Sequence, residues 1–153
     1  TRADVRRERP ARAAVAHAPA HVGGRQAAAE LALAYRFPEA RVTLVDSSAR
    51  AVACARRNLE QHGLAPRSEV LLTACAERDL KGAFDVIATN PPYYGNYRIA
   101  EAFLATASRV LAPGGRLVLV TKGTDWYRER LPGLFPRVAE VTAGDYTVFT
   151  ARR

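Results

Sequence analysis

Two short apolar runs, at residues 42–46 and 70–72, and the helical pattern between them restrict most strongly how this chain can fold. The runs are short enough for strands, and the intervening apolar residues recur at helical spacing. Ser47 or Ser48 can cap the helix at its start, and Gly63 can end it. A strand, a helix and a second strand in this order predict a βαβ unit, and with it an α/β fold.

The same alternation continues to the end of the chain. A helix over residues 28–37 should place Tyr35 on its apolar face and end before Pro38. Further on we expect strands at residues 84–89 and 117–120, with a Pro113-Gly114-Gly115 turn before the second strand. We expect helices at residues 99–111 and 126–135, the second with a break near Pro132. The chain should close with an antiparallel strand pair at residues 138–141 and 146–149. The order predicts an α/β fold with a doubly wound, mostly parallel sheet and a C-terminal antiparallel strand pair.

Residues 1–26 differ from the rest of the chain. They are rich in Ala and Arg, and they begin with Thr rather than Met. The string AAVAHAPAHV lacks the length and β-branched density of a central strand, and Pro19 would break its ladder. We therefore expect a degenerate first strand, an atypical segment over residues 1–26 that can be poorly ordered, and one folded domain over residues 27–153.

Composition restricts the class of protein further. The 153 residues contain no apolar run long enough to span a membrane and no signal-peptide pattern, so we expect a cytoplasmic protein without membrane contact. Cys54 and Cys75 stand far apart without zinc-ligand spacing, so we expect reduced core residues and no metal. The net charge of +8 favours a polyanionic partner such as nucleic acid. The oligomeric state does not follow from the sequence.

The sharpest chemical signal is the string Asn90-Pro91-Pro92-Tyr93. Prolines cannot continue a central strand, so Asn90 should lie at a strand's carboxyl end, where open α/β sheets bind ligands. An Asn oxygen and a neighbouring backbone carbonyl can accept both N–H bonds of a planar amino group, on which an aromatic ring can stack. The string predicts a site that directs a conjugated amino nitrogen at an electrophile. The alternative is an Asn-Pro turn without chemistry.

Asp46 is a second candidate, because it ends a strand just before a capped helix. In nucleotide-binding α/β folds, a carboxylate at this position accepts hydrogen bonds from ribose hydroxyls, and a glycine-rich loop lies about 20 residues upstream. Here the upstream stretch is HVGGRQA, at residues 21–27. The alternative is that Asp46 only complements the dipole of the following helix.

These motifs resemble a known family. Residues 90–93 are similar to the (Asp/Asn/Ser)-Pro-Pro-(Tyr/Phe/Trp) motif of S-adenosylmethionine-dependent methyltransferases that act on amino nitrogens. The strings ARVTLVDSSARAVACARRNLEQHGL, FDVIATNPPYYGNYRIAEAFLATASRVLAPGGRLVLVTKG and YTVFTA resemble the small-domain methyltransferases, which have the class I, Rossmann-like fold. That family includes the guanine-N2 methyltransferases of ribosomal RNA. The resemblance covers the chain from about residue 27 onward.

The resemblance implies a cofactor, a partner and a set of site residues. The cofactor would be S-adenosyl-L-methionine, and RNA, in particular ribosomal RNA, would be the substrate. On the cofactor side, the resemblance implies that Gly23 binds the methionine part, Asp46 and Ser47 the ribose, and Cys75 the adenine. On the target side, it implies that Asn90, Pro91 and Pro92 hold the amine and that a flipped base stacks on Tyr93. It also implies substrate contacts at Tyr94, Arg98 and Lys122.

Two positions depart from the family's pattern. The family's first motif is an acidic residue followed by Gly-x-Gly-x-Gly. Counting back without gaps from the following helix puts His21 at the acidic position, with Gly23, Arg25 and Ala27 at the three glycines. Arg25 places a long cation where the backbone must turn tightly. Cys75 stands where Asp or Asn usually binds the adenine. We therefore expect an intact target half and a compromised cofactor half.

The sequence leaves other functions open. The string at residues 90–93 also occurs in protein glutamine methyltransferases and adenine-N6 methyltransferases, and an RNA assay against a release-factor peptide would separate these substrates. A second alternative is an inactive RNA-binding remnant, which would bind RNA without binding cofactor. A nicotinamide-linked oxidoreductase has little support, because no G-x-G-x-x-G string occurs.

Overall fold

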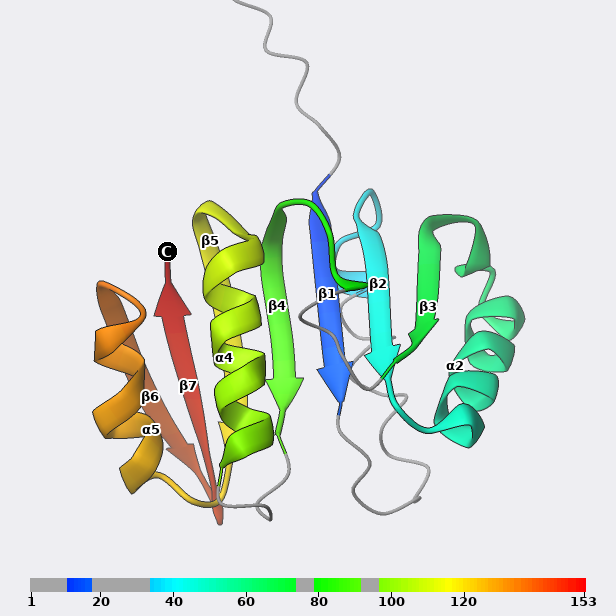
Figure 1. Ribbon diagram of the computed structural model, residues 1–153. Coiled ribbons are helices and arrows are strands. Elements are labelled where there is room, and N and C mark those ends of the chain that lie inside the picture. Colours follow the sequence, from blue (N-terminus) through cyan, green and yellow to red (C-terminus); the bar gives the residue numbers. More distant parts are fainter. Residues whose placement is uncertain (1–10, 18–33, 74–78, 92–96) are drawn as a thin grey trace, which may run out of the picture.

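The computed structural model describes residues 11–17, 34–73, 79–91 and 97–153, which form one sheet with helices on both faces (Figure 1). The sheet has seven strands in the order β3-β2-β1-β4-β5-β7-β6. The strands are β1 (Arg12–His17), β2 (Arg41–Asp46), β3 (Ser68–Leu72), β4 (Phe84–Asn90), β5 (Leu111–Thr121), β6 (Arg137–Ala143) and β7 (Tyr146–Arg152). The helices are α2 (Ala49–Gln61), α4 (Arg98–Val110) and α5 (Asp125–Arg130), with 3₁₀ turns η1 (Ala65–Arg67) and η2 (Leu131–Gly133).

The connections confirm the predicted doubly wound sheet. Strands β3, β2, β1, β4 and β5 are parallel, and β7 pairs antiparallel with both β5 and β6. The chain proceeds outward from β1 to β3 and then crosses back to β4 on the other side of β1. The strand order therefore reverses between β1 and β4. The carboxyl ends of β1, β2 and β4 share one edge, at the bottom of Figure 1.

Two cores lie on opposite faces of the sheet. Along β2 the side chains alternate, so Val42 and Leu44 pack into one core while Val45 packs into the other. The larger core lies under α4, α5 and η2, and its biggest fully buried side chains are Tyr127, Phe84, Phe149, Leu104, Leu111, Leu117, Leu119 and Leu131. The smaller core joins β2 to α2 through Ala34, Val42, Leu44, Leu59 and Leu64.

Helix α2 has the predicted boundaries. The Ser48 hydroxyl oxygen accepts a hydrogen bond from the Ala51 N–H at 3.3 Å, which satisfies one free donor of the first turn. Gly63 has a φ of +66°, a conformation that favours glycine just after a helix. One detail of the prediction is wrong, because Cys54 is exposed on this helix rather than in a core. Cys75 lies outside the described residues.

Strand β1 corrects the expectation that a first strand would be hard to place. It occupies the centre of the sheet and pairs with β2 and β4 along its length. Pairing on both sides satisfies its backbone groups, and the small side chains of Ala13 and Ala14 are buried. Its pairing and burial therefore override a low strand propensity. The predicted domain boundary at residue 26 lies outside the described residues and stays a prediction, although residues 12–17 belong to the sheet.

The Pro113-Gly114-Gly115 segment lies within β5 rather than before it, and it interrupts the pairing of β5 with β4. Strand β5 already begins at Leu111, and its pairing with β4 shifts register at this segment. Gly114 has a φ of +77°. A Cβ at Gly115 would lie 2.8 Å from the Ala112 carbonyl oxygen and 2.9 Å from that of Phe84, so glycine is required there.

The carboxyl-terminal elements match their prediction. The helix expected near residue 126 ends at Arg130 and continues as the 3₁₀ turn η2, which contains Pro132. Strands β6 and β7 form the expected antiparallel pair, with Gly144 at a φ of +59° in their turn. Residues 34–36 are helical as expected, but Tyr35 is 60% exposed rather than on a buried face, and its hydroxyl contacts His62 Nδ1 at 2.9 Å. No helix in the described part of the chain is long and apolar enough to cross a membrane.

Candidate active site at the carboxyl edge of the sheet

Asn90 is the last residue of β4 and lies at the point where the strand order reverses. Its backbone pairs with that of His17, the last residue of β1. The Asn90 side chain is exposed and has no hydrogen-bond partner among the described residues, whereas Pro91 is buried. The strand therefore ends with an exposed amide at the carboxyl edge, followed by a buried proline. This confirms the predicted place of Asn90 in the fold.

Asp46 ends β2 and is held by the start of α2. Its Oδ1 accepts a hydrogen bond from the Ser48 N–H at 2.7 Å, and its backbone carbonyl accepts one from the Thr73 N–H at 3.0 Å. Its Oδ2 has no hydrogen-bond partner in the described part of the chain. Asp46 and the neighbouring Ser47 are half-buried. The carboxylate thus serves the helix start with one oxygen and can accept a hydrogen bond from a ligand with the other.

Strand β1 sets the spacing between Asp46 and Asn90. Ala16 pairs with Val45 on one side and with Thr89 on the other. Asp46 and Asn90, one residue further along, therefore flank the end of β1. Because neighbouring strands lie about 4.8 Å apart, their backbones are separated by roughly 10 Å. The topology brings the two predicted groups to one edge, at the distance of two strand spacings.

An aromatic cluster lies beside this edge, where α4 begins. Tyr97 caps α4 with a φ of 60°, a left-handed conformation that is uncommon for a bulky residue. Its ring stacks on Trp126 with a centroid distance of 4.7 Å and meets Tyr127 edge-on at 6.0 Å. A Cβ at Gly123 would lie 3.2 Å from the Tyr97 hydroxyl. The cluster therefore ties the start of α4 to the β5–α5 connection.

An ion pair supports the same region. The Arg130 Nε donates to both Glu101 carboxylate oxygens, at 3.0 and 2.8 Å, and Nη2 also donates to Oε1. The hydrogen bonds from Arg130 hold the pKa of Glu101 below its ordinary value of 4.5. Tyr97, Arg98, Glu101 and Trp126 line a shallow hollow of about 370 Å³. Because Arg130 neutralises Glu101, the exposed Arg98 leaves this hollow with net positive charge.

The remaining predicted site residues lie in three different places: beside the hollow, beyond β5, and outside the described part of the chain. Arg98 lies at the start of α4 and lines the hollow. Lys122 is exposed after β5 and contacts the β6–β7 turn, with its Nζ 4.0 Å from Asp145 Oδ2 and 4.8 Å from the Tyr146 ring centre. Its contacts are on the side of β5 away from Asn90, so the structure does not bring the two together. The predicted residues outside the described part are Gly23, Cys75, Pro92, Tyr93 and Tyr94.

The residues predicted for the family's first motif follow β1, which ends at His17 beside Asn90. The motif positions assigned to His21, Gly23, Arg25 and Ala27 lie outside the described residues. Their assignment therefore stays a prediction.

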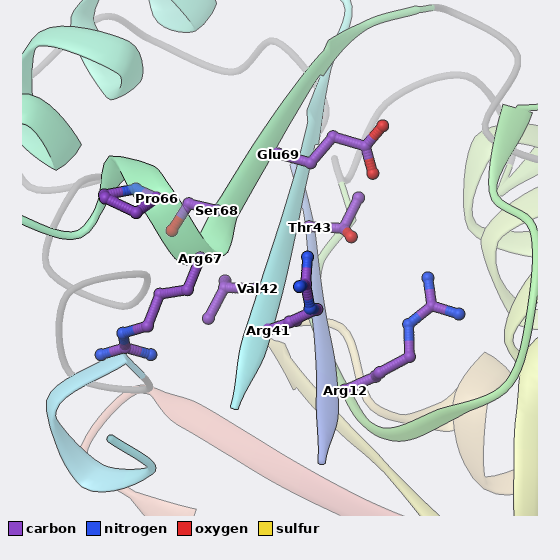
Figure 2. Close-up of a pocket in the computed structure, with 8 residues that line it drawn as sticks. All are labelled: Arg12, Arg41, Val42, Thr43, Pro66, Arg67, Ser68 and Glu69. Carbon is purple, nitrogen blue, oxygen red and sulfur yellow. The ribbon is translucent and has the colours of Figure 1, made fainter. Parts of the chain in front are cut away.

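A second hollow, of about 350 Å³, lies at the opposite edge of the sheet, near the amino ends of β1 to β3 (Figure 2). Two of its arginines have structural partners. Arg67 donates from Nη1 to the Ala40 carbonyl at 2.8 Å, and Arg12 lies over the Phe84 ring at 4.6 Å. Figure 2 shows these two side chains pointing to opposite sides. This hollow therefore does not present converging charges to a ligand.

The described residues contain no cluster of three or more His, Cys, Asp or Glu side chains that could hold a metal ion. What the carboxyl edge does hold is a carboxylate, an amide and an aromatic cluster around the reversal point of a doubly wound sheet. A family model described as the methyltransferase small domain matches residues 24–150. The chain belongs to this family.

Curated relatives carry related names. The chain is 37% identical over 122 residues to the ribosomal RNA large subunit methyltransferase G of Aeromonas salmonicida, and 36% identical over 121 residues to the ribosomal RNA small subunit methyltransferase C of Chromohalobacter salexigens. These matches cover 75% and 74% of this chain and 32% of each relative. The chain therefore spans about a third of the length of these relatives. The release factor glutamine methyltransferase of Chlorobaculum tepidum is 38% identical over 104 residues, which are 64% of this chain and 34% of that protein.

Solved structures show the same fold. The 16S rRNA N2 methyltransferase RsmC of T. thermophilus, in complex with AdoMet and guanosine, matches with a TM-score of 0.72 and 27% identity. That match covers 92% of this chain and 37% of the other. TrmN from Thermus thermophilus matches with a TM-score of 0.71 at 24% identity, over 94% of this chain and 45% of the other, and shows the fold alone. The sheet is thus that of the class I methyltransferases.

Proposed function

We propose that this domain transfers a methyl group from S-adenosylmethionine to an exocyclic amino nitrogen of a nucleobase, and that guanine N2 in ribosomal RNA is the target. The observation that carries the proposal is the exposed amide of Asn90 at the end of β4, at the reversal point of the sheet, with Asp46 two strands away. Ligands of open α/β sheets bind at this reversal point. The names of the relatives support RNA as the substrate class.

The described residues fit this cofactor on its ribose side. A ribose has two adjacent hydroxyls that can donate to a carboxylate, and Asp46 offers Oδ2 while α2 fixes Oδ1. The carboxylate is therefore held in one orientation before any ligand arrives, which lowers the entropic cost of binding. Cofactor bound across the end of β1 would place its methyl donor toward Asn90. The glycine motif and Cys75 remain predictions, because they lie outside the described residues.

The chemistry requires the nitrogen lone pair to be directed at a methyl group. Bound S-adenosylmethionine supplies a methyl group activated by the positive charge on its sulfur. The Asn90 side-chain oxygen accepts one N–H of the amine, and the Pro91 backbone carbonyl can accept the other. These two bonds would orient the nitrogen and stabilise the positive charge that it gains as its bond to the methyl carbon forms, while the carbon–sulfur bond of the cofactor would break and leave neutral S-adenosylhomocysteine. The excess proton leaves to water after transfer, so no general base is needed.

Methyl transfer from radiolabelled S-adenosylmethionine to total ribosomal RNA tests the proposal. We expect incorporated label, and digestion of the product to nucleosides should release N2-methylguanosine. Asn90→Ala should lower the rate of transfer roughly 100-fold. Label found only in N6-methyladenosine would replace guanine by adenine as the target. An absence of label in RNA, with cofactor binding intact, would contradict the proposal.

A second candidate substrate is a protein glutamine, because a named glutamine methyltransferase is among the similar proteins. Its amide nitrogen is conjugated to a carbonyl and needs the same two hydrogen bonds from Asn90 and Pro91. The two candidates differ in net charge, and the chain's charge of +8 favours RNA. A release-factor peptide assayed beside the RNA separates them, since label in the peptide alone would establish the second candidate.

A further inference from the structure

Three arginines form a row across the last three strands of the sheet. Arg116 of β5 pairs with Arg152 of β7, and Arg152 pairs with Arg137 of β6. Residues directly opposite each other in antiparallel strands point to the same face. The neighbouring residues Leu117 and Ala151 are buried in the larger core, so the arginine row points to the opposite face. All three arginines are exposed.

This arrangement is costly within the folded chain, because like charges directly opposite each other on a sheet repel. The three guanidinium groups form no ion pair with any acidic residue in the described part of the chain. The residues that share their face on these strands include no Asp or Glu: they are Val118, Val120, Ala139, Val141, Ala143, Tyr146, Val148 and Thr150. Among the described residues, no acidic side chain therefore offsets the repulsion within the row.

Several other arginines among the described residues have structural partners. Arg130 binds Glu101, Arg128 binds Glu140 at 2.9 Å, and Arg153 donates to the Arg109 carbonyl at 2.9 Å. The arginine row has no such use. It also lies away from α4 and α5, which cover the other face of these strands, as Figure 1 shows.

We propose that the arginine row of Arg116, Arg137 and Arg152 binds the phosphate backbone of the RNA substrate. The inference rests on the proposed function and extends it by naming where the RNA is held. Two strand spacings make the row about 10 Å wide, and long flexible side chains can reach phosphates on successive nucleotides. A polyanion turns the repulsion into attraction, and counterions released from RNA add affinity.

The row lies far from the chemistry. Strand β5 runs from Arg116 toward the carboxyl edge and ends at Thr121, which is about 17 Å away at the rise of a strand. The contacted nucleotides are therefore not the target nucleotide but others in the folded RNA. Contacts of this kind fix register without reading sequence. The row would set how tightly RNA binds, while Asn90 would set what happens to the target amine.

The test compares two triple variants of equal charge. The row variant is Arg116→Gln, Arg137→Gln and Arg152→Gln, and the control replaces the exposed arginines Arg36, Arg50 and Arg57 by Gln. Binding of a labelled 20-nucleotide single-stranded RNA is measured by fluorescence anisotropy at several salt concentrations. We expect the row variant to lower the slope of log affinity against log salt by roughly 2, and the control to change it much less.

A stability readout separates binding from a structural role. Because the substitutions remove repulsion, the row variant should melt roughly 1 to 3 °C higher than the wild type. An unchanged salt slope, or an equal change in the control, would overturn the inference, as would a large fall in melting temperature. Cofactor titration and methyl transfer are measured separately. If the wild type methylates RNA but the row variant binds RNA as tightly as the wild type, only the proposed role of the arginine row is contradicted. If RNA binds through the row but no methyl group is transferred, only the proposed function is contradicted.

Discussion

The two faces of the sheet differ in how much core supports them. The larger core joins β4, β5 and β7 to α4 and α5, and it lies behind Asn90. In the described part of the chain, the smaller core comprises five buried residues, on β2, on α2 and on the segments next to them, and it lies on the Asp46 side. Among the described residues, the side that would hold the target amine is therefore backed by more buried apolar side chains than the cofactor side. We therefore expect comparable substitutions on the two sides to change the stability of the protein by different amounts.

The largest expected effect comes from replacing one buried leucine by alanine, in each core separately. Leu104→Ala, at a fully buried position of the larger core, should lower the free energy of unfolding by about 3 to 5 kcal/mol. Leu59→Ala in the smaller core should cost about 2 to 3 kcal/mol, because the described part of this core has fewer buried residues and the site can relax more around the cavity. Urea denaturation measures both. Equal losses would mean that the two cores do not differ in support.

Asn90→Ala should separate the two sides by function. The substitution removes one hydrogen bond to the amine while the cofactor side stays intact, so the rate of methyl transfer should fall roughly 100-fold, or about 2.7 kcal/mol in the barrier. Cofactor affinity should remain within twofold of the wild type. Single-turnover kinetics with saturating cofactor measure the rate. A wild-type rate for Asn90→Ala would remove this residue from the chemistry.

Trp126→Leu tests the aromatic cluster that joins α4 to α5. It keeps apolar bulk but removes the stack on Tyr97, and we expect a loss of about 1 kcal/mol, seen as a melting temperature lower by roughly 2 to 4 °C. Tyr35→Leu, at an exposed ring on the smaller-core side, is the matched control and should lower it by less. A larger effect at Tyr35 would reverse the comparison.

The smallest expected effect concerns pH. Hydrogen bonds from Arg130 lower the pKa of Glu101 from its ordinary value of 4.5, so the pair stabilises the fold above that value and loses its contribution as the pH falls below it. Since the pair is partly exposed, the effect is small. Glu101→Gln should therefore flatten the loss of stability between pH 5 and 3, measured by urea titration. Glu60→Gln, on the exposed face of α2, should leave that slope unchanged.

Much of the fold follows from local pattern. The boundaries of α2 were predictable because Ser48 and Gly63 mark them chemically, and the place of Asn90 was predictable because prolines must end a central strand. Strand β1 was missed because its stability comes from pairing on two sides, which no local pattern shows. The break at Pro113-Gly114-Gly115 was predictable, but the pairing of Leu111 with Phe84 before it was not, because it joins residues far apart in the sequence.

The site was predictable in its chemistry and less so in its surroundings. Asp46 and Asn90 were identified because each follows a strand, and parallel strands end at one edge. The stack of Tyr97 on Trp126 and the ion pair of Glu101 with Arg130 join positions 29 residues apart in the chain, and the sequence gives no signal for such pairs. The left-handed conformation of Tyr97 has no sequence signal either, because bulky residues rarely adopt it.

The central claim is that Asp46 and Asn90 form the cofactor side and the target side of one site. Calorimetric titration with S-adenosylhomocysteine, the product left after methyl transfer, tests it most directly on the wild type, Asp46→Ala and Asn90→Ala. The account predicts micromolar binding by the wild type and by Asn90→Ala, and a loss of binding in Asp46→Ala. No binding by the wild type, or equal binding by Asp46→Ala, would contradict it.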